Sequence, residues 1–237
     1  MIVAENVGFR FLFDRQKRVV TPALARLRRR GTETWGVRAV SFTAARGQGL
    51  ALLGASGSGK TTLLRAMADV LRPDEGRLIV DGRVASLLSV DAGLLSALTG
   101  RENALLLGVL AGLSRAQSRA ALESVKERSG LGAAFERPVA SYSQGMRARL
   151  GFAVADETDP QILLLDEVHE ALDHEFRAVL ERRAHEILAA GGVVVAAGHD
   201  HEMLSRLCDH ALWLERGEVR GQGGFEPTRA AYLAATH

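Results

Sequence analysis

The residues best suited to do chemistry begin with a glycine-rich segment that fits the phosphate-binding pattern G-x-x-x-x-G-K-[ST] without a mismatch. It reads Gly54-Ala55-Ser56-Gly57-Ser58-Gly59-Lys60-Thr61-Thr62. Glycines let successive backbone N–H groups turn inward around phosphates, at the positive end of a following helix. In such a loop Lys60 reaches the β- and γ-phosphates and the Thr61 hydroxyl binds Mg²⁺. The pattern predicts a nucleotide-binding site.

The composition of the chain supports this role for Lys60. Of 30 lysine and arginine residues, only Lys17, Lys60 and Lys126 are lysines. A lysine in this arginine-rich chain indicates a position that needs a compact ammonium rather than a forked guanidinium. The alternative, a glycine-rich turn with a stray lysine, leaves the complete pattern unexplained. It also leaves unexplained the loop's setting between an apolar run at 50–53 and a predicted helix at 63–67.

Two carboxylates, Asp166 and Glu167, follow a short apolar run at 162–165 that we interpret as a buried strand. In a parallel sheet, ligands bind at the carboxyl ends of the strands, so both carboxylates can face the phosphate loop. Asp166 is then the Mg²⁺ partner, and Glu167 the candidate base or water-positioning group for attack on the γ-phosphate. An acidic helix N-cap after a core strand is the alternative.

Two further polar positions gain their meaning from where they lie. Ser143 and Gly145 stand at a predicted helix start, where N–H groups and a hydroxyl can contact phosphate oxygens, although a plain helix cap has the same pattern. His199 follows the apolar run 193–197 after a single glycine and could hydrogen-bond both the γ-phosphate and Glu167. A structural histidine is the alternative there.

The element pattern predicts an α/β protein with a mainly parallel sheet covered on both faces. We expect an edge strand at 1–13 with Phe9, Phe11 and Phe13 on one face, and a long loop or a loosely packed helix at 14–34. Strands are predicted at 37–44, 77–80, 83–88, 161–165, 193–197, 211–214 and 218–221, with helices at 175–189, 201–207 and 225–237. The segment 99–155 is helical almost throughout, with capping boxes at Thr99 and Ser114 and a helix end at Gly130.

Bulk properties fit a soluble globular protein with one large domain, or with one core and a small subdomain. The 237 residues are 47% apolar and 24% charged, with a net charge of +2. The single Cys208 excludes an intrachain disulfide and is typical of a reducing compartment. The longest apolar run, 104–113, is too short to span a bilayer, and residues 1–10 lack a secretory signal pattern. The basic run 26–30 is either a solvated face or an anion-binding segment.

The order of these motifs resembles an ATP-binding cassette (ABC) nucleotide-binding domain over nearly the whole chain. Within that family it is most similar to the ATPase subunits of exporters for O-antigen, teichoic acid and capsule-type polysaccharides. Three segments carry the closer resemblance: Leu98-Thr99-Gly100-Arg101-Glu102-Asn103, the signature Tyr142-Ser143-Gln144-Gly145-Met146 with the residues to Val154, and Leu207 to Leu214.

The resemblance implies a single ABC ATPase domain, 1–237. Its P-loop NTPase (RecA-like) core would comprise 1–93 and 156–237 with N-terminal antiparallel strands, and its inserted helical subdomain about 94–155. It also implies a head-to-tail homodimer around two MgATP, each between Lys60 and Thr61 of one copy and Ser143 and Gly145 of the other. Asp173 would face the partner's site, and His199 would act as the γ-phosphate switch.

Hydrolysis at Glu167 would drive a separate multi-span membrane permease. The protein would then sit peripherally on the cytoplasmic face of the plasma (inner) membrane, with membrane contact mainly through the permease and no nucleic acid as a partner.

Three features depart from the family pattern. Gln144 and Met146 replace a glycine and a glutamine of the general signature. The glutamine expected about 13 residues before Asn103 is missing, and Val90 stands there with Asp91 beside it. For stacking on adenine, Trp35 is the first candidate and Phe9 or Phe13 the others, while a core role is open for each.

Two other functions stay open at this point. One is an exporter ATPase for a drug, lipid or peptide. The other is a non-transport ABC ATPase of DNA repair or translation, although such proteins usually carry long coiled coils or tandem cassettes. A GTPase is disfavoured because the chain has no asparagine-lysine-x-aspartate motif.

Overall fold

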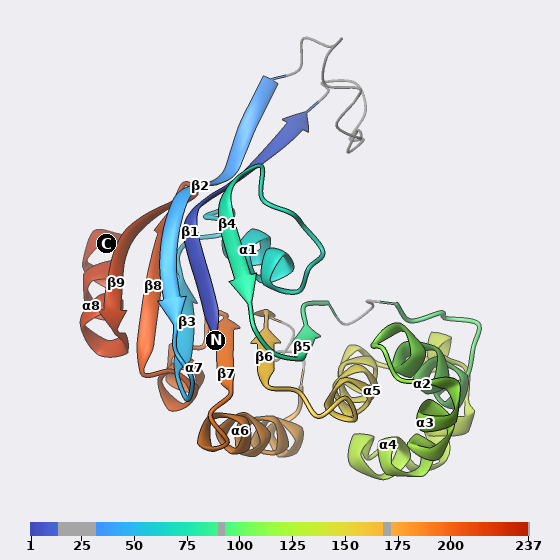
Figure 1. The fold of residues 1–237 in the computed structure, drawn as a ribbon. Helices are drawn as coiled ribbons and strands as arrows, with labels where there is room; N and C mark the ends of the chain where they lie inside the picture. Colours follow the sequence, from blue (N-terminus) through green and yellow to red (C-terminus); the bar gives the residue numbers. More distant parts are fainter. Residues whose placement is uncertain (14–31, 90–92, 168–171, 237) are drawn as a thin grey trace.

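The computed structural model describes residues 1–13, 32–89, 93–167 and 172–236, and its centre is a six-stranded sheet (Figure 1). The strand order is β5-β6-β7-β3-β8-β9. These strands are β3 (Gly49–Leu53), β5 (Val84–Leu87), β6 (Ile162–Leu165), β7 (Val193–Ala197), β8 (His210–Glu215) and β9 (Glu218–Gly224). All neighbouring pairs are parallel except β8 and β9, which are antiparallel. The predicted mainly parallel α/β core is confirmed.

A second, antiparallel sheet has the order β2-β1-β4, formed by β1 (Ile2–Phe13), β2 (Thr32–Ala44) and β4 (Glu75–Val80). The prediction of an edge strand at 1–13 was wrong, because β4 returns after helix α1 (Lys60–Met67) and pairs with the side of β1 that β2 leaves free. Strand β2 also begins at Thr32, inside the stretch predicted as a long loop or a loosely packed helix, where it extends the pairing with β1 to Phe13.

Successive residues of the parallel strands point to opposite faces of the sheet, as the two-residue period of a strand requires. Leu50 and Leu52 of β3 belong to a core shared with α1 and the three-stranded sheet. Ala51 and Leu53 belong to the opposite core, covered by helices α6 (His174–Ala189) and α7 (His201–Leu207) together with the start of α8 (Phe225–Thr236). Burial on both faces explains why these strands read as continuous apolar runs.

The helical segment contains α2 (Gly100–Leu110), α3 (Arg115–Ala120), α4 (Leu122–Ser129) and α5 (Gln144–Asp156). Both predicted capping boxes are present, at Thr99 and Ser114, and Gly130 ends α4 with the positive φ of 63° expected of a helix C-cap. These helices share their own apolar cluster, which includes Leu122, Val125, Phe135 and Leu150. Helix α5 lies between the other three and strand β5 (Figure 1).

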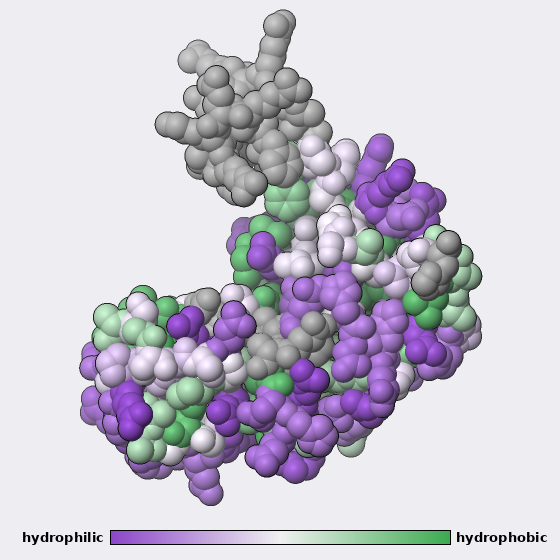
Figure 2. All heavy atoms as spheres, turned by 180° about the vertical axis from the view of Figure 1, so that it is seen from behind, coloured by the Kyte–Doolittle hydropathy of each residue, from purple (hydrophilic) through white to green (hydrophobic). Residues whose placement is uncertain are grey.

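The outer surface of the helical segment carries several exposed apolar side chains. Seen from behind, green apolar residues appear on this segment among polar ones (Figure 2), and Leu95, Val109 and Leu110 are its exposed large hydrophobic residues. None of the helices in the described ranges has the length and apolar character needed to cross a membrane.

Candidate functional site

The phosphate-binding loop connects β3 to α1 in the geometry that the pattern predicts. Gly54 and Gly59 have φ values of 144° and 112°, which L-residues rarely adopt. A Cβ on Gly54 would clash with the Leu214 carbonyl oxygen, and a Cβ on Gly59 would lie 2.8 Å from the Gly36 carbonyl oxygen. These glycines are therefore required both by the backbone conformation and by close packing against β8 and β2.

The remaining residues of the loop differ in exposure: its first part is exposed to solvent, and its second part is buried or half-buried. Ala55, Ser56 and Gly57 are exposed, while Ser58 is buried and the α1 residues Thr61 and Thr62 are half-buried. The Gly217 N–H donates to the Ser58 carbonyl at 3.0 Å, so the turn between β8 and β9 supports the loop. Sequence reasoning assigned Gly217 no role in this site, because nothing in the spacing links it to a residue so far away in the chain.

Lys60 is the first residue of α1, and its side chain curls back over the loop. Its Nζ donates to the carbonyls of Gly54 at 2.6 Å and Ala55 at 3.2 Å, and the residue is only 6% exposed. Burial lowers the pKa of Lys60, and the negative charges of Glu167 and Asp166 oppose that shift. The ammonium therefore interacts electrostatically with both carboxylates predicted to share its site.

Sheet topology brings the acidic pair and the histidine to one edge. Strands β6 and β7 are parallel neighbours, so the residues that follow them emerge on the same side, and β3 with the phosphate loop lies next to β7. His199 Nε2 lies 3.2 Å from Glu167 Oε1, with both side chains about half exposed. The predicted contact between His199 and Glu167 is therefore present, and it supports a role beyond that of a structural histidine.

Asp166 occupies a more enclosed position than Glu167. It is 6% exposed, and its Oδ1 accepts a hydrogen bond from the Glu167 N–H at 3.1 Å. Over the described ranges, no group of three or more His, Cys, Asp or Glu side chains could hold a metal ion. The two groups predicted to bind Mg²⁺ are the Thr61 hydroxyl and the Asp166 carboxylate. Such a small set fits this ion, because Mg²⁺ keeps several waters and binds through one or two carboxylates plus substrate phosphates.

Ser143 and Gly145 lie at the start of α5. Ser143 is exposed, and its Oγ accepts a hydrogen bond from the Met146 N–H at 3.2 Å, which makes it the helix N-cap. This is the local arrangement of the alternative interpretation, a plain cap. It is compatible with phosphate contact as well, since a hydroxyl that accepts one hydrogen bond still carries a proton to donate.

Tyr142 anchors this helix start from below. Its hydroxyl donates to the Ala134 carbonyl at 2.7 Å, and burial raises its pKa. Asp173 caps α6 by accepting from the Phe176 N–H at 2.9 Å, and its other oxygen lies 3.7 Å from Arg149 of α5. Sequence reasoning missed Arg149, whose only signal was its place six residues after Ser143.

Trp35 lies on β2, next to the Gly36 carbonyl that packs against Gly59. Its ring is half-buried, with the guanidinium carbons of Arg10 and Arg38 at 5.1 and 5.5 Å from its centroid. Phe9 is 2% exposed within the core, so it is unavailable for stacking on adenine. The side chain of Phe13, and Val90 with Asp91, lie outside what the structure describes.

The fold and this loop define a nucleotide-binding P-loop protein. Residues 37–170 match the ABC transporter family, and the chain belongs to that family. The chain is 36% identical over 206 residues to the O-antigen export system ATP-binding protein RfbB of Klebsiella pneumoniae, covering 87% of this chain and 84% of that protein. It is 34% identical over 198 residues to the teichoic acids export ATP-binding protein TagH of Listeria monocytogenes, covering 84% of this chain and 59% of that protein.

Solved structures agree on the fold. A dimeric ATP-binding cassette in a post-hydrolysis state, bound to ADP and Pi, superposes with a TM-score of 0.77 at 19% identity, covering 95% of this chain and 99% of the other. Membership of the family makes this chain an ATP-binding protein and an ATPase, as predicted.

Proposed function

We propose that the protein is the ATP-hydrolysing subunit of an exporter for a cell-surface polysaccharide, working through a separate multi-span permease at the cytoplasmic face of the inner membrane. The observation that carries this proposal is the 34–36% identity to O-antigen and teichoic acid export proteins over most of the chain. An exporter of another cargo would use the same ATPase mechanism, and only the permease that the subunit serves would differ.

Within one copy, the chain's own residues bind and orient the nucleotide. The loop N–H groups and Lys60 would hold the β- and γ-phosphates, and the Thr61 hydroxyl and the Asp166 carboxylate would hold Mg²⁺. When bound, Mg²⁺ neutralises charge that develops on the transferred phosphoryl group. Glu167 accepts a proton from the attacking water, and His199, 3.2 Å away, holds the carboxylate and senses the γ-phosphate.

A second copy completes the site in this proposal. Ser143 and Gly145 at the start of α5 contact the γ-phosphate of the partner's nucleotide through a hydroxyl proton and backbone N–H groups. Asp173, at the start of α6, faces the same interface. The division into a core of 1–93 and 156–237 and a helical subdomain of about 94–155 then separates the phosphate loop from the signature that closes on the other copy.

Substitution of the base tests the catalytic part. Glu167→Gln keeps the size and the hydrogen bonding of the side chain but removes its basicity, so steady-state hydrolysis should fall by about 10²- to 10⁴-fold. ATP affinity, measured by equilibrium titration, should stay within about threefold because Glu167 does not hold the phosphates. ATP should also trap the variant as a dimer in size-exclusion chromatography. Hydrolysis near the parent rate would remove Glu167 from this role.

The proposed association with a permease is tested by substituting exposed apolar side chains of the helical segment. Leu110 is 67% exposed at the end of α2, and a single exposed apolar residue of this kind tolerates a charge without loss of the fold. Leu110→Asp should reduce co-purification with a membrane protein encoded beside the gene. Val70→Asp, at a position 65% exposed after α1, is the matched control and should leave co-purification unchanged.

Recovery of the parent chain without any membrane partner would contradict the transport function. Hydrolysis stimulated by nucleic acid would favour the non-transport alternative instead.

A further inference from the structure

Helix α5, which begins at the signature, is shared between two apolar cores. Ala148 and Phe152 pack into the core beneath the sheet, where Phe152 meets Phe176 of α6 edge-on at 5.7 Å. Leu150 and Val154 pack into the cluster of the helical segment. The same helix therefore joins the helical segment to the nucleotide-binding core, and its orientation decides where Ser143 and Gly145 point.

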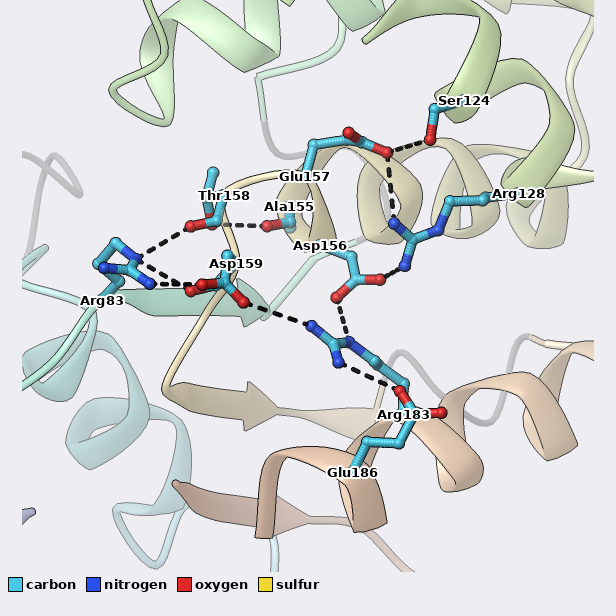
Figure 3. Close-up of polar contacts among 10 residues, drawn as sticks. All are labelled: Arg83, Ser124, Arg128, Ala155, Asp156, Glu157, Thr158, Asp159, Arg183 and Glu186. Atoms are coloured by element: carbon cyan, nitrogen blue, oxygen red, sulfur yellow. Dashed lines mark hydrogen bonds and ion pairs between the residues drawn. The ribbon is translucent and has the colours of Figure 1, made fainter. Parts of the chain in front are cut away.

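Asp156, the last residue of α5, links this helix to its neighbours through ion pairs. Its side chain is 2% exposed, and its carboxylate is bound from two sides (Figure 3). Arg183 of α6 donates through Nε at 2.6 Å, and Arg128 of α4 forms the second ion pair. One carboxylate thus connects three helices: one from the helical segment, one from the core, and α5 itself.

Both arginines are held by further contacts that limit their freedom. Arg128 also pairs with Glu157 at 3.3 Å, and Glu157 accepts from the Ser124 hydroxyl on α4. Arg183 also pairs with Glu186 at 3.1 Å on its own helix. At the solvent edge, Asp159 pairs with Arg83 at 2.7 Å and lies 3.9 Å from Arg183 (Figure 3). The network is therefore ordered around Asp156 and grows more exposed toward Asp159.

Burial of Asp156 constrains the positions of its two arginine partners, because a buried carboxylate is tolerated only while its partners stay in place. Helix α5 has 13 residues, so Asp156 and Ser143 lie about 20 Å apart along it. A tilt of about 5° at the Asp156 end would move the Ser143 end by nearly 2 Å over that length. Displacements of about 1 Å are enough to cost roughly 10²-fold where groups must align for reaction.

We propose that Asp156 is a positioning residue that sets the direction of α5, and with it the aim of Ser143 and Gly145 at the nucleotide of a second copy. It acts by holding Arg128 and Arg183 on one carboxylate. The inference rests on the proposed head-to-tail dimer, and it adds the residue that aligns the signature within each copy.

The test compares nucleotide binding with dimer formation in the full chain carrying Glu167→Gln, which traps the ATP-bound dimer. Asp156→Asn keeps the side-chain shape and removes the charge shared by the arginines. MgATP affinity should stay within about twofold, because the phosphate loop lies in the core. The ATP-dependent dimerisation constant, from analytical ultracentrifugation well below the melting temperature, should weaken about tenfold or more.

Two control variants separate positioning from stability and from surface charge. Asp159→Asn removes a carboxylate of the same network whose side chain is 84% exposed, and it should leave dimerisation unchanged. Ile187→Ala removes buried volume from α6 without touching Asp156, so it should lower the melting temperature but not the dimerisation constant. If Asp156→Asn does not fold, Arg128→Gln, at a half-exposed arginine, replaces it and should weaken dimerisation by a smaller factor.

A dimerisation constant unchanged by the Asp156 or Arg128 substitution would overturn the inference, and so would an equal loss in Ile187→Ala. Absence of an ATP-dependent dimer in the Glu167→Gln parent would instead contradict the proposed function, and this inference would fall with it.

Discussion

In the proposed function, the phosphate loop and the signature are two half-sites, and the fold positions them by different means. Lys60, Glu167 and His199 follow different strands, yet strand order brings them to one edge, where they interact within a single copy. Ser143 and Gly145 are positioned by one helix, and the Ser143 hydroxyl bonds only three residues away, at Met146. The first half-site is assembled by long-range topology. The second is a local structure that, in the proposed function, acquires its ligand from another copy.

The largest effect is expected from a substitution that disrupts only the first half-site. Lys60→Met replaces the ammonium with an unbranched apolar side chain of similar length. Because the Lys60 ammonium donates to the Gly54 and Ala55 carbonyls, its removal should also lower folding stability by about 1–3 kcal/mol. ATP affinity should fall about 100-fold through loss of charge-assisted bonds to phosphate, which corresponds to about 2.7 kcal/mol. Isothermal titration measures the affinity, and thermal melting measures the stability.

Lys126→Met is the matched control, since it removes a second lysine of the chain from a half-buried place on α4. It should leave ATP affinity unchanged. Binding of ATP by Lys60→Met within about threefold of the parent would show that the loop does not use its lysine.

A smaller effect is expected from a change that affects only the second half-site. Ser143→Asp retains an N-cap, because aspartate caps helices as well as serine does and its charge is favourable at a helix start. Folding stability should therefore change by less than about 0.5 kcal/mol. A carboxylate beside the partner's γ-phosphate should weaken ATP-dependent dimerisation about tenfold or more, while ATP affinity of the single copy stays the same.

Ser114→Asp provides the control for capping itself. Ser114 caps α3 with the same geometry, accepting from the Gln117 N–H at 3.2 Å, and no phosphate role is proposed for it. If both substitutions leave dimerisation intact, Ser143 is a helix cap and nothing more.

The same contrast explains how much the sequence could predict. The phosphate loop, the two capping boxes and Gly130 depend on short-range patterns, and the structure has them where they were predicted. The buried strands around Leu52 and Leu164 were also predicted, because burial on both faces leaves an unbroken apolar run.

Features that depend on distant pairing were beyond sequence reasoning. Strand β1 was taken for an edge strand, since nothing in its residues reveals that β4 will pair with its free side. The support of Ser58 by Gly217, and the sharing of Asp156 by Arg128 and Arg183, join segments whose contact only the fold creates. A charged residue at the end of a helix reads as solvent-exposed until the partner helices are known.

The smallest expected effect is that of Trp35, and it tests whether this residue is part of the first half-site. If its ring stacks on adenine, Trp35→Ala should weaken ATP and GTP affinity alike by about five- to tenfold, because any base presents a π face. The chain has two tryptophans, so in a Trp213→Phe background the emission comes from Trp35 alone, and ATP should quench it. Arg10 and Arg38 already lie near the ring, so stacking must compete with these cation–π contacts. Unchanged emission with unchanged affinity would assign Trp35 to the packing of β1 against β2, and the half-site would end at the phosphate loop.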